Sequence, residues 1–500
     1  MHVALPKENF PELFFGLVAP IGTQFDCAVK QLEAELKSFG YQVKHIRITE
    51  LFEKFAKVLP PKTPFNTENK YNRYSSYIDY GNHLRETLSE NAILAIAAMY
   101  QISIERAYLQ NDGNRPQKTA YIIRQFKRPE EIELLRAVYG EKFFQISVYS
   151  SRTARVENLA SIFSKDLGEA TNDNQKSNAE SIVEVDLDEG ESEYGQRIRK
   201  TFHDADVIFN GDAEPNKIEK QVTRFTKLLF GSNKISPTKD EYGMRLAKSA
   251  ALRSIDLSRQ VGAAVFDDSG QILALGSNEV PKASGGTYWS DSKEGQDARE
   301  YSRGLDSNDE RKRELLDEII KILKLEKSDD ALEKLSNSQM MDALEYGRVV
   351  HAEMCAITDA SRKGLSLLNS TLYCTTFPCH MCAKHIVASG IMRVVFLEPY
   401  PKSLVSRLHN DSVEVENSPR GQYKDYPAVK FEHFHGVTPK RFDQLFYRGK
   451  RKDQTGKFIE YSNQTGSPVI DARDKIYLRI ESALIENSVR PLLQPSTKSK

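Results

Sequence analysis

The sequence predicts a chain of two α/β domains, and three observations support this fold class. Residues 13–19 (LFFGLVA) form a short apolar run, and a glycine turn separates it from apolar residues at helical spacing up to about Phe39, the order expected at the start of an α/β domain. Apolar segments with the lengths of strands and helices alternate again between 351 and 397. The length of 500 residues also exceeds what one hydrophobic core usually serves, which favours two or three domains.

The first domain is expected at about residues 10–230 and is predicted to contain a parallel sheet. A second helix is predicted at 91–109, and two further buried strands are predicted at 142–149 and 206–210. Residues 165–200 are polar and acidic, so we expect an exposed insertion with a mobile part.

The turn-rich segment 231–240 marks the predicted boundary, and the second domain is expected at about 240–480. Two apolar runs flank the turn cluster 267–270, which predicts a pair of strands. A highly charged segment at about 285–345 is expected to be an insertion that contains one amphipathic helix, at about 309–325. The elements that follow alternate, which predicts a sheet with helices on both faces, an α/β/α arrangement. They are a helix at 351–363, a strand at 371–376, a helix at 380–389 and a strand at 392–397.

The composition narrows the functional classes. Lys and Arg number 70, as do Asp and Glu, so the chain has no net charge to attract nucleic acid or an anionic membrane, although a local basic pocket is allowed. No stretch approaches the ~20 apolar residues of a membrane span, and residues 1–15 lack the features of a signal peptide. Five cysteines are too few for a disulfide framework. We therefore expect a cytoplasmic protein with reduced cysteines.

Two short motifs provide the candidate chemistry. His351-Ala352-Glu353 and Pro378-Cys379-His380-Met381-Cys382 together have the spacing H-x-E…P-C-x-x-C, which is similar to the zinc deaminase signature. A catalytic zinc site uses three protein ligands and leaves one position open for water. We therefore predict His351, Cys379 and Cys382 as zinc ligands. A helix that starts at the cysteine pair would favour thiolate over thiol, and proline suits such a start.

Glu353 is the predicted general acid and base. It lies two residues after the ligand His351, so it can reach the open face of the site without binding the metal. The alternative is a closed structural zinc site with Cys355 or Cys374 as a fourth ligand. Structural sites usually use paired C-x-x-C motifs and this chain has one, which favours the catalytic interpretation.

Residues 240–440 resemble the deoxycytidylate deaminase branch of the cytidine deaminase fold. The resemblance lies in SRQVGAAV (258–265), LALGSNEVP (273–281), HAEMCAI (351–357), LYCTTFPCHMCAKHIVASGI (372–391) and RVVFLEPYPKS (393–403). It implies that Zn²⁺ is the cofactor, that Asn278 binds the sugar of the substrate, and that a free deoxycytidine nucleotide (dCTP or dCMP) is that substrate. Taken alone, Asn278 is equally a turn residue. Arg259 and Lys402 are candidate phosphate contacts, with solvated surface charge as the alternative.

The segment 16–23 (GLVAPIGT) is similar to a P-loop, in which backbone N–H groups hold phosphates at the start of a helix. Gly16, Gly22 and Thr23 are the candidate nucleotide-binding residues. Five residues rather than four separate the glycines and the phosphate-binding lysine is absent, so we expect nucleotide or regulator binding rather than phosphoryl transfer. A purely structural glycine turn is the alternative. Nearby, Arg124, Lys127, Arg152 and Arg155 are candidate phosphate contacts that could equally lie on a solvated face.

Stretches 120–140, 143–155 and 203–212 resemble P-loop NTPases of the nucleotide kinase type. A P-loop-like domain joined to a deoxycytidylate deaminase-like domain resembles the anti-phage dCTP deaminases of bacterial defence. This resemblance implies depletion of dCTP, regulation of the first domain by a nucleotide or an inhibitory RNA, and a homo-oligomer. The alternatives are a housekeeping dCMP deaminase, a nucleic-acid cytidine deaminase, and a nucleotide sensor with an inactive deaminase site; intact Glu353 argues against the last.

Overall fold

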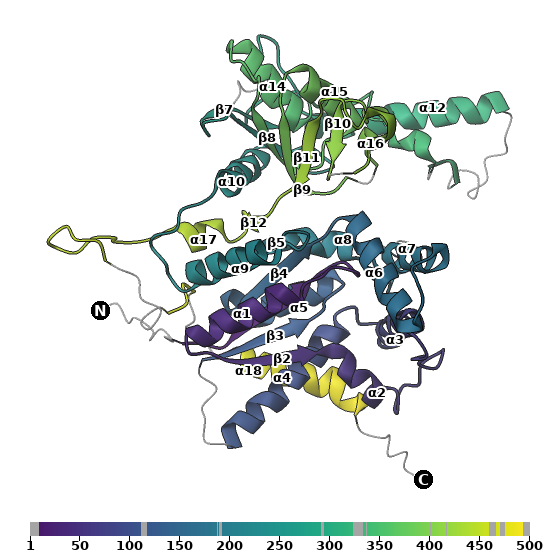
Figure 1. Cartoon of the computed structure of the whole chain (residues 1–500). Coiled ribbons are helices and arrows are strands. Elements are labelled where there is room, and N and C mark those ends of the chain that lie inside the picture. The colour runs from purple at the N-terminus through teal and green to yellow at the C-terminus, as the bar shows by residue number, and fades with distance from the viewer. Residues whose placement is uncertain are drawn as a thin grey trace. The chain divides into compact units, whose positions relative to one another are not determined.

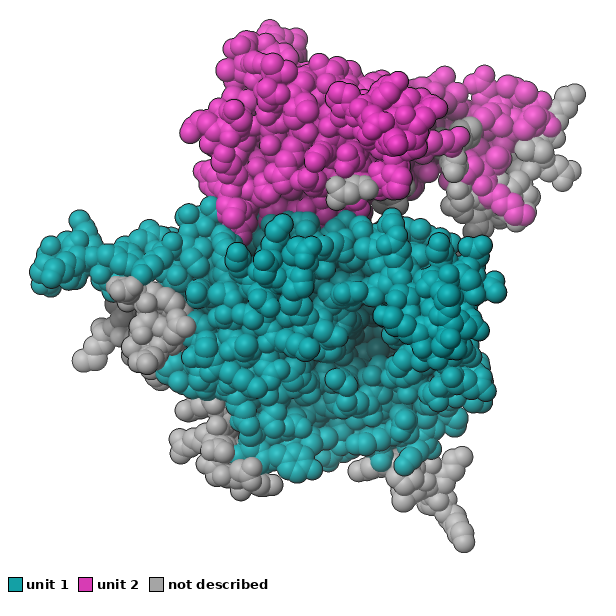
Figure 2. Space-filling model, viewed as in Figure 1, with its two compact units in different colours: residues 1–237, 435–500 teal, residues 238–434 magenta. Residues whose placement is uncertain are grey.

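The computed structural model describes residues 10–493 except for 112–117, 188, 190–192, 292–294, 324–333, 337, 401, 417, 460–466 and 471–475. The chain divides into two compact units, one formed by residues 1–237 and 435–500 and the other by residues 238–434 (Figures 1 and 2). Within the described residues, no single helix has the length and hydrophobicity to cross a bilayer, although one bent pair of helices, Lys70–Leu88 with Ile93–Leu109, reaches that limit together. The expectation that residues 1–15 contain no signal peptide falls mostly on residues 1–9, which lie outside the described residues.

The first unit contains a six-stranded sheet with the order β12-β5-β4-β1-β3-β2, in which all pairs but β12–β5 are parallel (Figure 1). Its strands are β1 (Leu13–Val18), β2 (Gln42–Arg47), β3 (Thr119–Arg124), β4 (Phe143–Tyr149), β5 (Val207–Asn210) and β12 (Gly436–Val437). The connection after β1 leads to β2 on one side, whereas the connection after β3 leads to β4 on the other side. The neighbours β1 and β3 therefore form the switch point of the sheet, where open α/β sheets bind ligands at the carboxyl ends of their strands.

Helices cover both faces of this sheet because alternate residues of each strand face opposite sides. Leu13, Phe15 and Leu17 of β1 belong to the core that also contains apolar residues of α1 and α9, while the ring of Phe14 stacks on Tyr139 of α5. The helices are α1 (Asp26–Ser38), α2 (Phe52–Phe55), α3 (Lys70–Leu88), α4 (Ile93–Asn111), α5 (Pro129–Tyr139), α6 (Arg152–Leu167), α7 (Asp173–Leu187), α8 (Ile198–Thr201), α9 (Pro215–Leu229), α17 (Phe442–Phe446) and α18 (Ile476–Leu484).

The prediction of an exposed insertion at 165–200 is wrong for helix α7. Ala179, Ile182, Val183 and Asp186 of this helix are buried, and the first three pack in one cluster with apolar residues of α6. These four positions recur at helical spacing, so they form one face. The many charged residues between them made the segment resemble a solvated one.

The C-terminal segment belongs to the first unit, whereas the sequence had suggested a second domain extending to about residue 480. Strand β12 pairs with β5, and Arg441 forms an ion pair with buried Asp206 at 2.7 Å. Further along, Glu481 forms an ion pair with Arg106, which also contacts Glu12. Burial raises the pKa of Glu481, so these hydrogen bonds are needed to hold its charge inside the unit. Such long-range polar contacts leave no periodic signal in the sequence.

We expect Tyr477→Phe to destabilise the first unit by about 1–3 kcal/mol, because it leaves a buried carboxylate oxygen without its donor. The Tyr477 hydroxyl donates a 2.6 Å hydrogen bond to Glu12 Oε2, and phenylalanine would keep the ring contacts. Amide hydrogen exchange in β1 and β3 measures this change. Exposed Tyr447→Phe is the matched control and should change stability by less than about 0.5 kcal/mol. Equal protection in both variants would contradict the expectation.

The second unit contains another six-stranded sheet, with the order β10-β11-β9-β8-β6-β7. Strands β6 and β7 are antiparallel to each other, β6 is antiparallel to β8, and the remaining pairs are parallel. The strands are β6 (Gly262–Phe266), β7 (Ile272–Ser277), β8 (Thr371–Thr376), β9 (Arg393–Glu398), β10 (Val413–Val415) and β11 (Val429–His433). The expected combination of parallel sheets and helices, a mixed α/β fold, is confirmed for this chain.

Two glycines let helices approach the two faces of this sheet closely. A Cβ on Gly276 would lie 2.1 Å from the backbone oxygen of Ala352 in α14, and one on Gly262 would lie 1.9 Å from that of Ala247 in α10. Helix α14 therefore packs on one face and α10 on the other, as the alternating pattern predicted. The helices are α10 (Lys239–Ala251), α11 (Glu300–Arg303), α12 (Ser307–Leu323), α14 (Ala352–Arg362), α15 (His380–Ala388) and α16 (Val405–Leu408). Helices α11 and α12 lie in the charged insertion.

Candidate active site

The two sequence motifs meet where two helices begin on the same face of the second sheet. His351 is the N-cap residue of α14, and Cys379 is the N-cap residue of α15, which follows the end of β8. Pro378 lies immediately before that cap. Because both side chains belong to helix starts, their positions are set by the packing of α14 and α15 rather than by flexible loops.

The side chains of His351, Cys379 and Cys382 form a compact donor set. The Nδ1 atom of His351 lies 3.3 Å from the Cys379 sulfur and 3.4 Å from the Cys382 sulfur. All three ligand atoms lie within 4.8 Å of one another. A tetrahedral zinc site with bonds of about 2.0 Å to nitrogen and 2.3 Å to sulfur requires nitrogen–sulfur separations of about 3.5 Å. The donor atoms thus fit zinc in both type and spacing.

The surroundings of Cys379 favour its thiolate form. Hydrogen bonds from Cys382 and His351 lower the pKa of Cys379 to about 4, and the start of α15 adds to this effect. The Cys379 sulfur also accepts a hydrogen bond from the backbone N–H of Cys382 at 3.4 Å. The hydrogen bond with Cys379 in turn raises the pKa of His351 to about 9. A thiolate is the form of cysteine that binds metal.

Glu353 lies beside this donor set, in the first turn of α14. Its side chain is buried and lines the same cavity as His351 and Cys379, and its Oε2 atom lies 3.6 Å from the Cys382 sulfur. Burial raises the pKa of Glu353. The carboxylate is thus adjacent to the donor atoms and faces the space in which a substrate would lie.

Among the described residues, the donor set contains three protein side chains and not four. Cys355 is buried on α14 but lines a different cavity, and Cys374 lies inside β8. Burial raises the pKa of both thiols, which opposes metal binding. The geometry therefore favours a site with one open position over a closed structural site.

The donor set opens into a cavity of about 400 Å³ in the second unit. Its walls come from the loop before β6, the ends of β7 and β8, the start of α14 and the charged insertion. The insertion and the short segment after it contribute residues that sequence reasoning had not connected with the site: Asp306, Ser307, Asn308, Asp309, Lys312, Leu344, Gly347, Arg348 and Val349. The only sequence feature that could have connected these residues with the site was the position of Arg348, three residues before His351.

Asn278 lines the cavity directly after β7, and its side-chain amide holds the neighbouring loop. Its Oδ1 atom accepts a hydrogen bond from the N–H of Val261 at 2.7 Å, and its Nδ2 donates to the carbonyl of Arg259 at 2.8 Å. The residue thus fixes the backbone at 259–261 beside the donor set. The contact with the substrate sugar that the family resemblance implies stays a prediction.

Four basic side chains line the cavity, and they differ in how far they are already neutralised. Lys312 pairs with Asp309, Arg348 with Glu300, and Lys402 with Asp342. The guanidinium of Arg259 has no ion pair with the described residues and lies over the ring of Tyr400 at 5.0 Å. Of the two phosphate contacts predicted from the sequence, Arg259 is therefore better placed to receive an anion than Lys402. His380 does not line the cavity.

The three candidate nucleotide-binding residues of the glycine loop in the first unit do not lie together at one cavity. Gly16 lies inside β1, where a Cβ would meet the ring of Phe143 at 2.7 Å, so its small size serves packing. Gly22 and Thr23 line a separate cavity in the first unit. Gly22 has a φ of +87°, and a Cβ there would lie 2.6 Å from the backbone oxygen of Arg155. Glycine is thus required at position 22 by the loop conformation itself.

Comparison with known proteins places the site in a family context. Residues 237–398 match the family model of the cytidine and deoxycytidylate deaminase zinc-binding region. A probable deoxycytidylate deaminase from Drosophila melanogaster is 29% identical over 199 residues, which are 39% of this chain and 78% of that protein. The deoxycytidylate deaminase of Enterobacteria phage T2 is 42% identical over 74 residues, which are 14% of this chain and 39% of that protein.

Among solved structures, the dCMP deaminase of cyanophage S-TIM5 is 18% identical and has a TM-score of 0.22, with 40% of this chain and 99% of that chain covered. The matched span contains the three residues of the donor set, and the family match and the donor geometry agree on zinc as the cofactor. The second unit therefore contains a region similar to the zinc-binding region of cytidine and deoxycytidylate deaminases, and these findings support a zinc-dependent hydrolytic deaminase.

Proposed function

We propose that this chain hydrolyses the 4-amino group of a free deoxycytidine nucleotide, giving the deoxyuridine nucleotide and ammonia. The observation that carries the proposal is the donor set of His351, Cys379 and Cys382, which lies beside Glu353 at the wall of one cavity. The relatives from fly and phage T2 are named as deoxycytidylate deaminases, which supports the choice of nucleotide. The same three-ligand set with a nearby glutamate is the arrangement used for cytosine deamination.

The chain's own residues supply the proton chemistry of this reaction. A zinc ion held by His351, Cys379 and Cys382 supplies a Lewis acid that makes water nucleophilic near neutral pH. Glu353 accepts a proton from the attacking water and delivers it to N3 of the ring as the oxygen adds to C4. Glu353 then transfers the proton of the new C4 hydroxyl to the 4-amino nitrogen, the C4–N bond breaks, and ammonia leaves as the C4 carbonyl forms. The burial of Glu353 in the cavity wall keeps bulk water away from these transfers.

The cavity favours a free nucleotide over a polynucleotide. Its volume of about 400 Å³ suits a single small molecule. A protein that binds single-stranded nucleic acid usually has a basic groove with exposed aromatic rings, whereas acidic Asp256, Asp306 and Asp309 share this cavity with its basic residues. Arg259 is the proposed contact for the substrate phosphate, and Asn278 the proposed contact for the sugar.

The biological role proposed for this activity is depletion of dCTP in bacterial anti-phage defence. In that role the first unit restrains the deaminase until a nucleotide or an inhibitory RNA signals infection, and the chain acts as a cytoplasmic homo-oligomer. The basis is the resemblance of nearly the whole chain to anti-phage dCTP deaminases. A housekeeping dCMP deaminase that supplies dUMP is the second candidate, and the names of the fly and phage T2 relatives favour it.

The purified chain is expected to release ammonia from dCMP, dCTP or both, and to leave single-stranded DNA unchanged. Coupled ammonia detection and chromatography of the uracil product measure each reaction, with cytidine as the unphosphorylated comparison. Preference for dCTP would favour the defence role and preference for dCMP the housekeeping role. Product from DNA alone would contradict the proposal.

Arg259→Ala tests the phosphate contact in the same assay. A hydrogen bond to a charged group contributes about 1.5–3 kcal/mol, so KM for the nucleotide should rise about 10–100-fold while the reaction with cytidine changes little. Arg407→Ala is the matched control, because Arg407 is exposed in the same unit and does not line the cavity. If Arg259→Ala weakened the reactions with the nucleotide and with cytidine equally, Arg259 would support the structure of its loop rather than contact the phosphate.

A further inference from the structure

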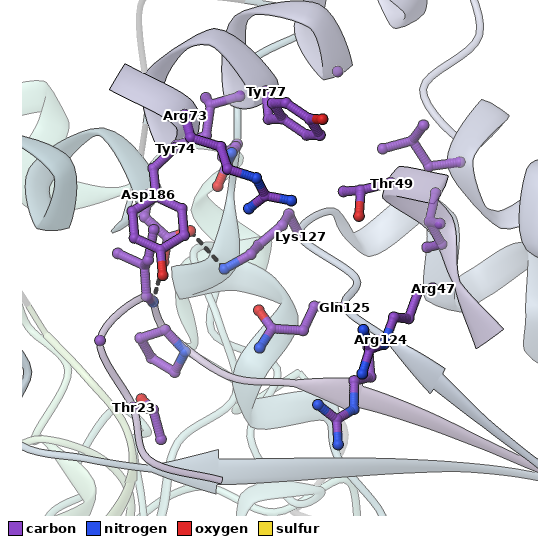
Figure 3. Close-up of a pocket in the computed structure, with 18 of the residues that line it drawn as sticks. Thr23, Arg47, Thr49, Arg73, Tyr74, Tyr77, Arg124, Gln125, Lys127 and Asp186 are labelled. Carbon is purple, nitrogen blue, oxygen red and sulfur yellow. Dashed lines mark hydrogen bonds and ion pairs between the residues drawn. The ribbon is translucent and has the colours of Figure 1, made fainter. Parts of the chain in front are cut away.

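The first unit has a cavity of its own, with a volume of about 430 Å³ (Figure 3). It lies at the carboxyl ends of β1, β2 and β3, and is closed by residues of α3 and of the segments around Asp186 and Gln196. This is the switch point of the sheet, since β1 and β3 send their following helices in opposite directions. The position favours ligand binding on topology alone.

One end of the cavity concentrates positive charge. Arg47 and Arg124 are the last residues of neighbouring strands and face each other in register across β2 and β3. Figure 3 shows their side chains on the same side of the cavity. Among the described residues, the only ion pair formed by these two arginines joins Arg124 to Asp26. The side chain of Asp26 is 74% exposed, so solvent strongly screens this ion pair. Two adjacent guanidinium groups with so little neutralisation favour an anionic ligand.

A third arginine extends this charge across the cavity. The guanidinium of Arg73 on α3 points into the space, 4.5 Å from the centre of the Tyr77 ring (Figure 3). It forms no ion pair with the described residues. By contrast, Lys127 is already neutralised, because its ammonium lies 2.6 Å from a carboxylate oxygen of Asp186. Arg47, Arg73 and Arg124 are therefore the groups available to an anion.

The lining also holds buried polar atoms that have no hydrogen-bond partner among the described residues. These atoms are the hydroxyl of Thr23, the side-chain oxygen of Gln196, the Nε of Arg85 and the Nε of Arg124. Thr23 is 7% exposed and Gln196 is 5% exposed. A buried polar atom without a partner is costly, so a native structure that contains several at one cavity usually pairs them with a ligand or with water.

Aromatic rings form the remaining walls of the cavity. Tyr74 and Tyr77 on α3 line it together with Phe25 and Phe52. Such rings bind a planar heterocycle by stacking and exclude water from it. A ligand that satisfies both parts of this cavity has an anionic group and a flat ring.

The glycine loop itself is already occupied by a group of the protein. The backbone N–H of Ile21 donates a 2.7 Å hydrogen bond to Asp186 Oδ2, and Asp186 is fully buried. In a phosphate-binding loop this N–H would face the ligand. A phosphate at that position would compete with a buried carboxylate and be repelled by it. The anionic part of the ligand is therefore directed away from the loop and toward the arginines.

We propose that this cavity binds a nucleotide whose phosphates contact Arg47, Arg73 and Arg124, and whose base lies against Tyr74 and Tyr77. The proposal rests on the nucleotide-binding role proposed for the first unit. It places the phosphates at the two strand-end arginines and at Arg73 of α3, rather than at the glycine loop. It does not depend on deamination by the second unit.

Binding to the full-length chain tests the site. We would titrate the chain with the ribo- and deoxyribonucleoside mono- and triphosphates, adenosine and inorganic triphosphate by calorimetry. At least one nucleotide should bind more tightly than adenosine or inorganic triphosphate, because only a nucleotide uses both parts of the cavity. Arg47→Ala and Arg73→Ala should each weaken this binding about 10–100-fold, the effect of losing a charged hydrogen bond.

Matched controls separate the site from the fold and from the deaminase. Arg152→Ala removes an exposed arginine of the same unit outside the cavity and should leave the affinity unchanged. Arg47 is exposed, so Arg47→Ala should keep the wild-type melting temperature, and Arg47→Gln provides a second variant. When the nucleotide is added, amide hydrogen exchange should slow at residues 47–52 and 70–80, which border this cavity. The slowing there should be larger than any change at residues 256–280, which border the cavity of the second unit.

Three outcomes would overturn the proposal: no nucleotide binds, an RNA binds in place of every nucleotide, or Arg47→Ala and Arg73→Ala both bind with wild-type affinity. Deamination is measured on the same preparations. Nucleotide binding that depends on Arg47 in a chain that deaminates nothing would count against the proposed deaminase function alone. Wild-type deamination without nucleotide binding would count against this site alone.

Discussion

Glu353→Gln is expected to lower kcat for deamination by about 10²–10⁴-fold, the usual contribution of a positioned general acid and base. Glutamine has nearly the same size and keeps a polar contact near Cys382, but it cannot accept and return a proton. The loss should fall on kcat rather than on KM, because the proposed sugar and phosphate contacts, Asn278 and Arg259, are unchanged. Steady-state kinetics on dCMP and dCTP measure both parameters.

Two further measurements make this result specific to Glu353. Zinc content should stay at about one ion per chain in Glu353→Gln, since the three predicted ligands remain. Glu414→Gln changes a carboxylate of the same unit that does not line the cavity, and it should keep wild-type activity. Undiminished activity in Glu353→Gln would show that another group transfers the protons. Loss of zinc together with activity would mean that Glu353 supports the metal site instead.

The core of the site could be predicted from the sequence because its chemistry depends on short spacings. A histidine and a glutamate two residues apart at a helix start, and two cysteines three residues apart at another, place their donors in nearly fixed relation once each helix forms. Packing of α14 and α15 on one sheet face then brings the two motifs together. The alternation of short apolar segments predicted a sheet with helices on both faces, but not which helices share a face.

The walls of the cavity could not be predicted in the same way. Lys312 lies in a charged insertion, and Arg348 lies just after it, in sequence whose composition resembles that of any solvated segment. Their role depends on how the insertion folds back over the start of α14, which is a long-range property. Asn278 is intermediate, because its place after β7 was predictable, whereas its hydrogen bonds to the 259–261 loop were not.

In the first unit, the glycine loop indicated the edge of the sheet at which the cavity lies, and two of its residues, Gly22 and Thr23, line that cavity. The motif comparison selected Gly16, which lies inside β1, and it passed over Arg47 and Arg73. The position of Arg47 beside Arg124 follows from the register of β2 and β3, and that of Asp186 at the glycine loop follows from its hydrogen bond with Ile21. Pairs that are far apart in sequence and close in space carry this information, and one sequence does not reveal them.

Cys379→Ser is expected to reduce zinc from about one ion per chain to near zero after dialysis and to abolish deamination, because a catalytic site has only three protein ligands to begin with. Serine replaces a thiolate that the start of α15 stabilises with a hydroxyl that stays protonated. Metal binding contributes to folding, so the second unit should also unfold at a lower temperature. Mass spectrometry of the metal and a thermal melt measure the two effects.

Cys355→Ser is the matched control that decides between the open and the closed site. Cys355 is a buried cysteine four residues after His351 on the same helix, yet it lies outside the three-residue donor set. The open site predicts that Cys355→Ser retains zinc and activity apart from a modest loss of stability. A fourth-ligand role predicts that zinc is lost here as it is in Cys379→Ser, and with no open position for water the deaminase mechanism would fail. If zinc is retained in Cys355→Ser and lost in Cys379→Ser, the zinc site has three protein ligands. Its fourth position is then open for the water that hydrolysis requires.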